Sequence, residues 1–233
     1  MAEQLPLDLP LRPALGRSEF AVSSANSDAM RLVEGWETWP QGKLVLYGPE
    51  GSGKTHLAHV WADLSGAVVL QANATEITET TAKCVVVEDV PEIGGEVALE
   101  EALFHLHNRI LAQNGRLLLT GQATPAAWPI ALPDLASRVQ GTLSVALDTP
   151  DEDLLSYILL KLFADRQLTP SPKALATLVL HMERSFAEAG RLVAEMDRRA
   201  LVGRRKISDA LAREVLGLSE ATARPLPLDD ADT

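Results

Sequence analysis

The sequence is poor in cysteine and in positive charge. Its single cysteine, Cys84, excludes a scaffold of intramolecular disulfide bonds. The 21 Lys and Arg residues face 32 Asp and Glu residues, which gives a net charge of −11. Because phosphate contacts need concentrated positive charge, we do not expect the chain to hold nucleic acid through its overall electrostatic field.

Long apolar runs are absent as well. No uninterrupted apolar stretch is long enough to span a bilayer, and the N-terminus does not join a basic start to an apolar run, as a signal peptide does. Hydrophobic residues nevertheless make up 46% of the 233 residues, enough for the core of one large domain or of one and a half. We therefore expect a reduced, soluble, cytoplasmic protein that makes no membrane contact.

The most specific pattern is a glycine-rich run, Gly48-Pro49-Glu50-Gly51-Ser52-Gly53-Lys54-Thr55, between an apolar run at 43–47 and a helical stretch. In this strand–loop–helix context, backbone N–H groups and a helix N-terminus surround phosphate groups. Lys54 would reach the β- and γ-phosphates, and Thr55 would bind Mg²⁺. The run predicts a site for ADP or ATP with Mg²⁺. Its expected nucleotide-binding residues are Gly48, Pro49, Gly51, Ser52, Gly53, Lys54, Thr55 and His56.

Short apolar runs alternate with helical stretches along the first two thirds of the chain. The runs lie at 44–47, 67–71, 84–88, 116–120 and 143–147. The alternation predicts an α/β fold with a parallel five-stranded sheet and helices on both faces. Further helices are expected at about 27–39 and 96–113. In such sheets ligands bind at the carboxyl ends of the strands.

The run at 84–88 ends in two carboxylates, Glu88 and Asp89. In a phosphate-loop protein the first would hold Mg²⁺ through water, and the second would polarise the attacking water. The usual order is Asp and then Glu, so the reversed order predicts nucleotide binding with inefficient hydrolysis, because positioning dominates this chemistry. Thr120 ends the run at 116–120 and is expected to sense the γ-phosphate, although a threonine at a strand end is commonplace.

A short helix is expected at 132–139, and Arg138 lies at its exposed end. An arginine in this place can reach a nucleotide bound by a neighbouring subunit and stabilise charge that develops on its γ-phosphate. It can equally form a surface ion pair. The residues alone favour the ion pair.

From residue 150 the chain predicts four helices and no strand, as in a small helical domain beside the nucleotide core. Arg184, at the start of the third of these helices, can lean onto the phosphates. After residue 219 the chain is polar and proline-rich, and we expect a disordered tail. The expected organisation is an extended arm, a nucleotide-binding core, a helical lid and a tail, at 1–16, 17–148, 149–218 and 219–233.

The N-terminal arm carries spaced leucines after a glutamine, among prolines that prevent a helix. Two interpretations remain open: an arm that lies on its own domain, or a short linear motif that a partner's hydrophobic pocket binds. The residues expected to bind the partner are Gln4, Leu5, Leu7 and Leu9.

Taken together, these residues resemble one family. The run from Gly48 to Thr55, continued by His56 and Leu57, resembles the phosphate loop of the DnaA family of replication initiators. Leu135-Ala136-Ser137-Arg138 resembles the family's box VII with its arginine finger, and Glu183-Arg184-Ser185-Phe186 falls at its sensor 2. The resemblance covers about 17–218 and implies an AAA+ P-loop NTPase core with an all-α lid.

The arm resembles the motif with which the Hda family, DnaA-related AAA+ regulators, binds the sliding clamp. We expect the chain to lack DnaA's N-terminal interaction domain and DNA-binding domain. The resemblance implies that the partners are DnaA and the DNA polymerase III β sliding clamp, with DNA met only indirectly. It also implies that Arg138 promotes hydrolysis of DnaA-bound ATP and so prevents re-initiation, while the chain's own ATPase activity is weak or absent.

An alternative is an AAA+ ATPase of the helicase-loader type, which would act on its own ATP and depend on Asp89. A third interpretation is a nucleotide-gated scaffold in which Arg138 is only structural. The sequence leaves the oligomeric state open, including a homo-oligomer, and it does not decide whether ADP or ATP is resident.

Overall fold

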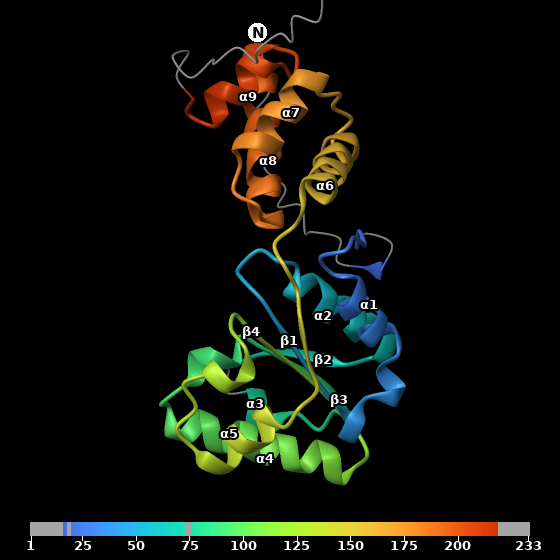
Figure 1. The fold of residues 1–233 in the computed structure, drawn as a ribbon, viewed down its shortest axis with the longest axis vertical. Helices are drawn as coiled ribbons and strands as arrows, with labels where there is room; N and C mark the ends of the chain where they lie inside the picture. The colour runs from blue at the N-terminus through green and yellow to red at the C-terminus, as the bar shows by residue number, and fades with distance from the viewer. Residues whose placement is uncertain (1–15, 18–19, 73–75, 219–233) are drawn as a thin grey trace, which may run out of the picture. The chain divides into compact units, whose positions relative to one another are not determined.

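The computed structural model describes residues 16–17, 20–72 and 76–218, which form two compact units (Figure 1). One unit holds the described residues up to Gly48 together with Gly53–Leu147. The other holds Pro49–Ser52 and the described residues from Asp148 onward. The four arm residues expected to bind a partner, Gln4, Leu5, Leu7 and Leu9, lie outside the described residues, as does the whole expected tail.

A parallel sheet organises the first unit, with the described strands in the order β2-β3-β4-β1-β5 (Figure 1). The strands are β1 (Lys43–Tyr47), β2 (Val68–Gln71), β3 (Cys84–Glu88), β4 (Arg116–Gly121) and β5 (Ser144–Ala146). Each overlaps one of the five predicted apolar runs, although β1 begins one residue before its run and β4 ends one residue after its run. The predicted α/β class and parallel five-stranded sheet are therefore confirmed.

Helices cover both faces of this sheet (Figure 1). They are α1 (Ser27–Glu34), α2 (Lys54–Ser65), α3 (Glu76–Glu79), α4 (Val97–Ala112) and α5 (Pro133–Gln140). Single 3₁₀ turns occur at η2 (Trp36–Thr38), η3 (Pro40–Gly42), η4 (Val90–Ile93) and η5 (Pro125–Ala127). Because successive strand side chains point to opposite faces, Val45 and Val87 pack in the core that α4 and α5 cover, and Leu46 and Val86 pack in the core of α1 and α2.

The first helix ends earlier than predicted, at Glu34 instead of about residue 39. Pro40 explains part of the difference, because a proline disfavours helical backbone in the residue before it. Trp39 accordingly has φ −56° and ψ 130°. Its indole N–H donates to the Leu32 carbonyl at 2.7 Å, and its ring lies 5.0 Å from that of Trp61. The 3₁₀ turns thus place an aromatic anchor where the pattern predicted further helix.

The second unit consists mainly of four described helices around one apolar core. They are α6 (Glu152–Asp165), α7 (Pro172–His181), α8 (Phe186–Gly203) and α9 (Asp209–Val215). An N-cap side chain accepts a backbone N–H in each: Asp151, Ser171, Ser185 and Ser208. The third of these helices includes Gly203, and the residue that turns left-handed after it is Arg204, at φ 48°. None of the described helices is long and apolar enough to cross a membrane.

Candidate nucleotide site

The glycine-rich run connects β1 to α2, as predicted. Gly48, Gly51 and Gly53 have φ values of 155°, 72° and 96°, a region in which residues with a Cβ are strained. The Gly48 N–H donates to the Gly121 carbonyl at 3.2 Å, which joins the end of β1 to the end of β4. The Gly53 carbonyl accepts the first helical hydrogen bond of α2, from Leu57, at 2.9 Å. The loop therefore has the backbone that phosphate binding at a helix N-terminus needs.

The polar side chains in and after the loop differ in burial and in their hydrogen-bond partners. Lys54 is buried, and its ammonium group donates to the Gly48 carbonyl at 2.9 Å. Ser52 is also buried, and its hydroxyl has no hydrogen-bond partner among the described residues. Thr55 is exposed at the first turn of α2. The His56 ring packs edge-on against Phe20, 5.1 Å between centroids.

The end of β3 brings Glu88 and Asp89 into different environments. Glu88 is 2% exposed; its Oε2 accepts from the Gln71 amide at 3.0 Å, and its Oε1 has no partner among the described residues. Asp89 turns left-handed at φ 54° and ψ 44°, and its N–H donates to the buried Thr120 hydroxyl at 3.0 Å. The left-handed turn at Asp89 ends the extended backbone of β3 directly after Glu88.

The unpartnered buried oxygen of Glu88 is what a metal site at the end of β3 should contain, since buried polar atoms normally have partners. A carboxylate oxygen is also a ligand that Mg²⁺ prefers. Among the described ranges, no group of three or more His, Cys, Asp or Glu side chains could hold a metal ion alone. An Mg²⁺ ion here would therefore draw other ligands from Thr55, water and nucleotide phosphate.

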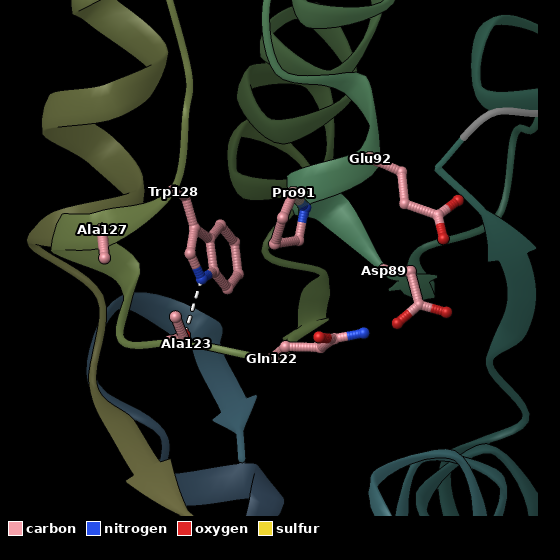
Figure 2. Close-up of a pocket in the computed structure, with 7 residues that line it drawn as sticks. All are labelled: Asp89, Pro91, Glu92, Gln122, Ala123, Ala127 and Trp128. Atoms are coloured by element: carbon pink, nitrogen blue, oxygen red, sulfur yellow. Dashed lines mark hydrogen bonds between the residues drawn. The ribbon is translucent and has the colours of Figure 1, made fainter. Parts of the chain in front are cut away.

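A shallow pocket of about 250 Å³ lies beyond the carboxyl ends of β3 and β4 (Figure 2). It is lined by Asp89, Pro91, Glu92, Gln122, Ala123, Ala127 and Trp128. Figure 2 shows the side chains of Asp89 and Gln122 pointing toward one another, while the Trp128 indole N–H donates to the Ala123 carbonyl at 2.7 Å. The volume is below the roughly 300–1,000 Å³ that is typical of small-molecule sites.

Arg138 lies in the last turn of α5 and is exposed. Its guanidinium carbon is 5.0 Å from the centroid of the Phe104 ring. The surface ion pair that the residues alone favoured is not found among the described residues. The backbone carbonyl of Arg138 accepts hydrogen bonds from Thr142 Oγ1 at 2.8 Å and from Lys43 Nζ at 3.4 Å. The finger role stays a prediction.

Sequence reasoning missed three residues of α4 near α5, of which Glu100 contacts the segment before α5 and Phe104 contacts Arg138. Glu100, Phe104 and His107 follow one another at helical spacing, and Glu100 and His107 are 1% exposed. The Glu100 carboxylate accepts backbone N–H groups from Gly95, Ala131 and Leu132 at 2.7, 2.9 and 2.6 Å. Two of these donors directly precede α5. The sequence offered one signal for this contact, a glutamate next to a row of apolar residues at helical spacing.

Burial, backbone hydrogen bonds and neighbouring charge set the pKa values of Glu100 and His107 on α4. Burial acts to raise the pKa of Glu100, but the hydrogen bonds from Ala131, Gly95 and Leu132 outweigh it, so the pKa lies below its ordinary value. Burial, and then the charge of Lys43, lower the pKa of His107 to about 4. His107 is therefore neutral at neutral pH.

Arg184 lies in the second unit, in the turn before α8. Its guanidinium pairs with the Glu152 carboxylate at 2.6 Å, and both side chains are more than half exposed. Exposed pairs of this kind contribute little free energy, so the pair presents only a small barrier to another anion. Binding of a nucleotide phosphate by Arg184 stays a prediction.

Comparison with known proteins identifies the fold. No family model matches the chain. Domain III of the replication initiation protein DnaA from Thermotoga maritima matches with a TM-score of 0.78 at 17% identity, over 90% of this chain and 98% of that one. AMPPCP-bound DnaA from Aquifex aeolicus matches at 0.70 and 16%, over 83% and 68% of the two chains. The RuvB Holliday junction branch migration motor of Thermotoga maritima matches at 0.65 and 18%, over 87% and 71%.

At such identities the likeness concerns the fold and not the activity. The parallel sheet with its phosphate loop and the helical C-terminal part are the features common to this chain and the AAA+ class that the sequence resembles. The chain therefore has a DnaA-like AAA+ P-loop NTPase fold.

Proposed function

We propose that this protein is an Hda-type regulator, which binds ADP or ATP with Mg²⁺ and promotes hydrolysis of ATP bound to DnaA. The observation that carries the proposal is Arg138, an exposed arginine that ends α5 and forms no ion pair within the described ranges. An exposed guanidinium without a counter-ion is available to a phosphate group on another molecule.

The chain's own nucleotide binding is supported by its loop. The glycine conformations and the buried Lys54 are those that a phosphate would use, and the unpartnered Glu88 oxygen is one that a metal ion would use. The likeness to DnaA bound to AMPPCP supports the same reading. Removal of the Lys54 ammonium group should weaken nucleotide binding without unfolding the sheet.

The proposal of weak hydrolysis by the chain itself is supported by the residues at the end of β3. The shorter Asp89 occupies the second position, where the family has a glutamate, and its left-handed backbone places it by the pocket beyond β3. Since positioning dominates phosphoryl transfer, we propose a structural role for the resident nucleotide. An exposed Arg138 then acts on the nucleotide of DnaA.

In this proposal the arm binds the clamp through Gln4, Leu5, Leu7 and Leu9. The support is the resemblance of their sequence to a clamp-binding motif. Clamp tethering also accounts for how a chain of net charge −11 reaches DNA. The partners proposed are thus DnaA and the DNA polymerase III β sliding clamp.

The test measures ATP hydrolysis by the cognate DnaA, with clamp loaded on DNA, in the presence and absence of this protein. Wild type should stimulate, and Arg138→Ala should lose the stimulation, because such arginines contribute on the order of 10³ or more in rate. Arg31→Ala is the matched control, since Arg31 is an exposed arginine of the same unit, on α1. A third variant changes Gln4 and Leu5 to alanine and should fail to bind the clamp.

Each outcome distinguishes a part of the proposal. Normal stimulation by Arg138→Ala would refute the finger role of Arg138. Normal stimulation by the arm variant would refute the clamp-binding role of the arm. No stimulation by wild type, with ATP turnover of its own that Asp89→Ala abolishes, would favour the helicase-loader type of ATPase. Nucleotide and clamp binding without either activity would favour a scaffold.

A further inference from the structure

One face of α4 contacts both ends of the finger helix α5. Near the start, the Glu100 carboxylate holds the N–H groups of Ala131 and Leu132. Near the end, four residues further along α4, the Phe104 ring lies under the Arg138 guanidinium. Side chains four residues apart lie on the same face of a helix, so one surface of α4 positions α5 and its terminal arginine together.

The contact at the end of α5 has the geometry of a cation–π interaction. The guanidinium carbon lies 5.0 Å from the ring centroid, within the roughly 6 Å over which such contacts are attractive. Phe104 is half-buried and packs against the core beneath α4, so the core holds its ring in place. Arg138 by contrast is exposed, and among the described residues the Phe104 ring is the contact found for its guanidinium.

A long exposed arginine samples many rotamers, and ordering it at a partner's phosphate carries an entropic cost. A ring that already restricts the guanidinium lowers that cost, as preorganisation does in binding and catalysis. The backbone is restrained at the same place, because the Arg138 carbonyl accepts from Thr142 Oγ1 and from Lys43 Nζ.

We propose that Phe104 is a positioning residue that orders the Arg138 guanidinium for its action on a nucleotide bound by another protein. The inference rests on the proposed function, and it adds a residue that does not touch the nucleotide itself. The ring acts through Arg138 alone, so its effect requires an aromatic face and not merely an apolar side chain.

The test compares Phe104→Leu with Phe104→Tyr in the DnaA hydrolysis assay. Leucine fills the core position but has no π face, whereas tyrosine retains one. Phe104→Leu should lower the maximal stimulated rate by about two- to fivefold, the factor that a cation–π contact at an exposed site supplies. The protein concentration at half-maximal stimulation should stay unchanged, and Phe104→Tyr should retain the wild-type rate.

Two further measurements separate positioning from folding. Leu99→Ala truncates another half-buried residue of α4 in the same core and should leave the rate unchanged. The Arg138 Nε–H resonance, identified by its loss in Arg138→Lys, should show a ring-current shift that Phe104→Leu abolishes.

The outcomes distinguish a failure of this inference from a failure of the proposed function. Wild-type stimulation by Phe104→Leu, equal loss in Phe104→Tyr and Phe104→Leu, or an unshifted Arg138 resonance would overturn the inference while the function stands. A wild-type protein that never stimulates DnaA would overturn the proposed function, and this role of Phe104 with it.

Discussion

The Glu100 carboxylate offers a sharp test of how the finger helix is held. It is 1% exposed, and it accepts three backbone N–H groups. Its Oε1 takes two of them, from Gly95 and Ala131, and its Oε2 takes the third, from Leu132. We predict that Glu100→Gln, which keeps the size of the side chain, destabilises the first unit markedly.

The size of the effect follows from the three bonds. In glutamine the carbonyl oxygen can replace Oε1, but its amino group then faces the Leu132 N–H, a donor against a donor. One hydrogen bond to a charged acceptor is lost, which costs about 1.5–3 kcal/mol. The other two weaken, because charged acceptors bind about twice as strongly as neutral ones. The expected loss is about 3 kcal/mol in the free energy of unfolding.

Urea denaturation followed by tryptophan fluorescence measures this loss of stability in the first unit. All four tryptophans, at positions 36, 39, 61 and 128, belong to the first unit. With a slope of about 2 kcal/mol per molar urea, the midpoint should fall by about 1.5 M. Glu101→Gln is the matched control: it lies next to Glu100 on the same helix but is exposed, so its midpoint should not move.

The pH dependence provides a second check. The pKa of Glu100 is lowered in the folded state, so its contribution to stability is complete above the ordinary glutamate value of about 4.3. It is lost as the pH falls through the lowered folded-state pKa. The difference between wild type and Glu100→Gln should therefore be constant above about pH 5 and shrink in stronger acid. Equal midpoints for Glu100→Gln and Glu101→Gln would refute the reasoning.

Three further predictions concern single positions. The imidazole of His107 should titrate by NMR with a midpoint near pH 4, and stability should fall as the pH drops from about 6.5 toward that value, because the unfolded chain binds the proton first; a midpoint near 6.5 would contradict the burial argument. Gly121→Ala should cost about 1–3 kcal/mol, because the new Cβ would lie 2.6 Å from the Trp128 ring; an unchanged urea midpoint by fluorescence would count against it. Gly190→Ala in α8 meets no atom within 4 Å and should stabilise the second unit by about 0.5–1 kcal/mol, measured by circular dichroism; a loss of stability would be the wrong sign.

Much of the fold was predictable because its signals are local. Strands appeared as apolar runs, and the phosphate loop appeared as glycines that take positive φ at Gly48, Gly51 and Gly53. The end of α1 was mispredicted because apolar residues continue at helical spacing as far as Trp36, whereas the α-helix ends at Glu34 and Trp39 takes the extended backbone that Pro40 favours. The class of fold was thus accessible, while helix ends depended on single residues.

The candidate site was only partly predictable from the sequence. Sequence identified Glu88, Asp89 and Thr120 as strand-end residues, but only the folded chain turned Asp89 left-handed and placed its N–H on the Thr120 hydroxyl. Those two residues lie 31 positions apart. Their contact follows from the pairing of β3 with β4.

By itself the sequence determined the alternating sheet and the loop between β1 and α2, since periodicity and glycine conformation act over a few residues. Tertiary structure decided what holds Arg138 at the surface: the Phe104 ring and, at the other end of α5, the buried Glu100 carboxylate. A charged glutamate and a half-buried phenylalanine read as ordinary helix residues in one dimension. They gain their contacts only when α4 packs against a segment some thirty residues further along the chain. Burial removes water from the Glu100 carboxylate, so backbone N–H groups of that segment become its partners.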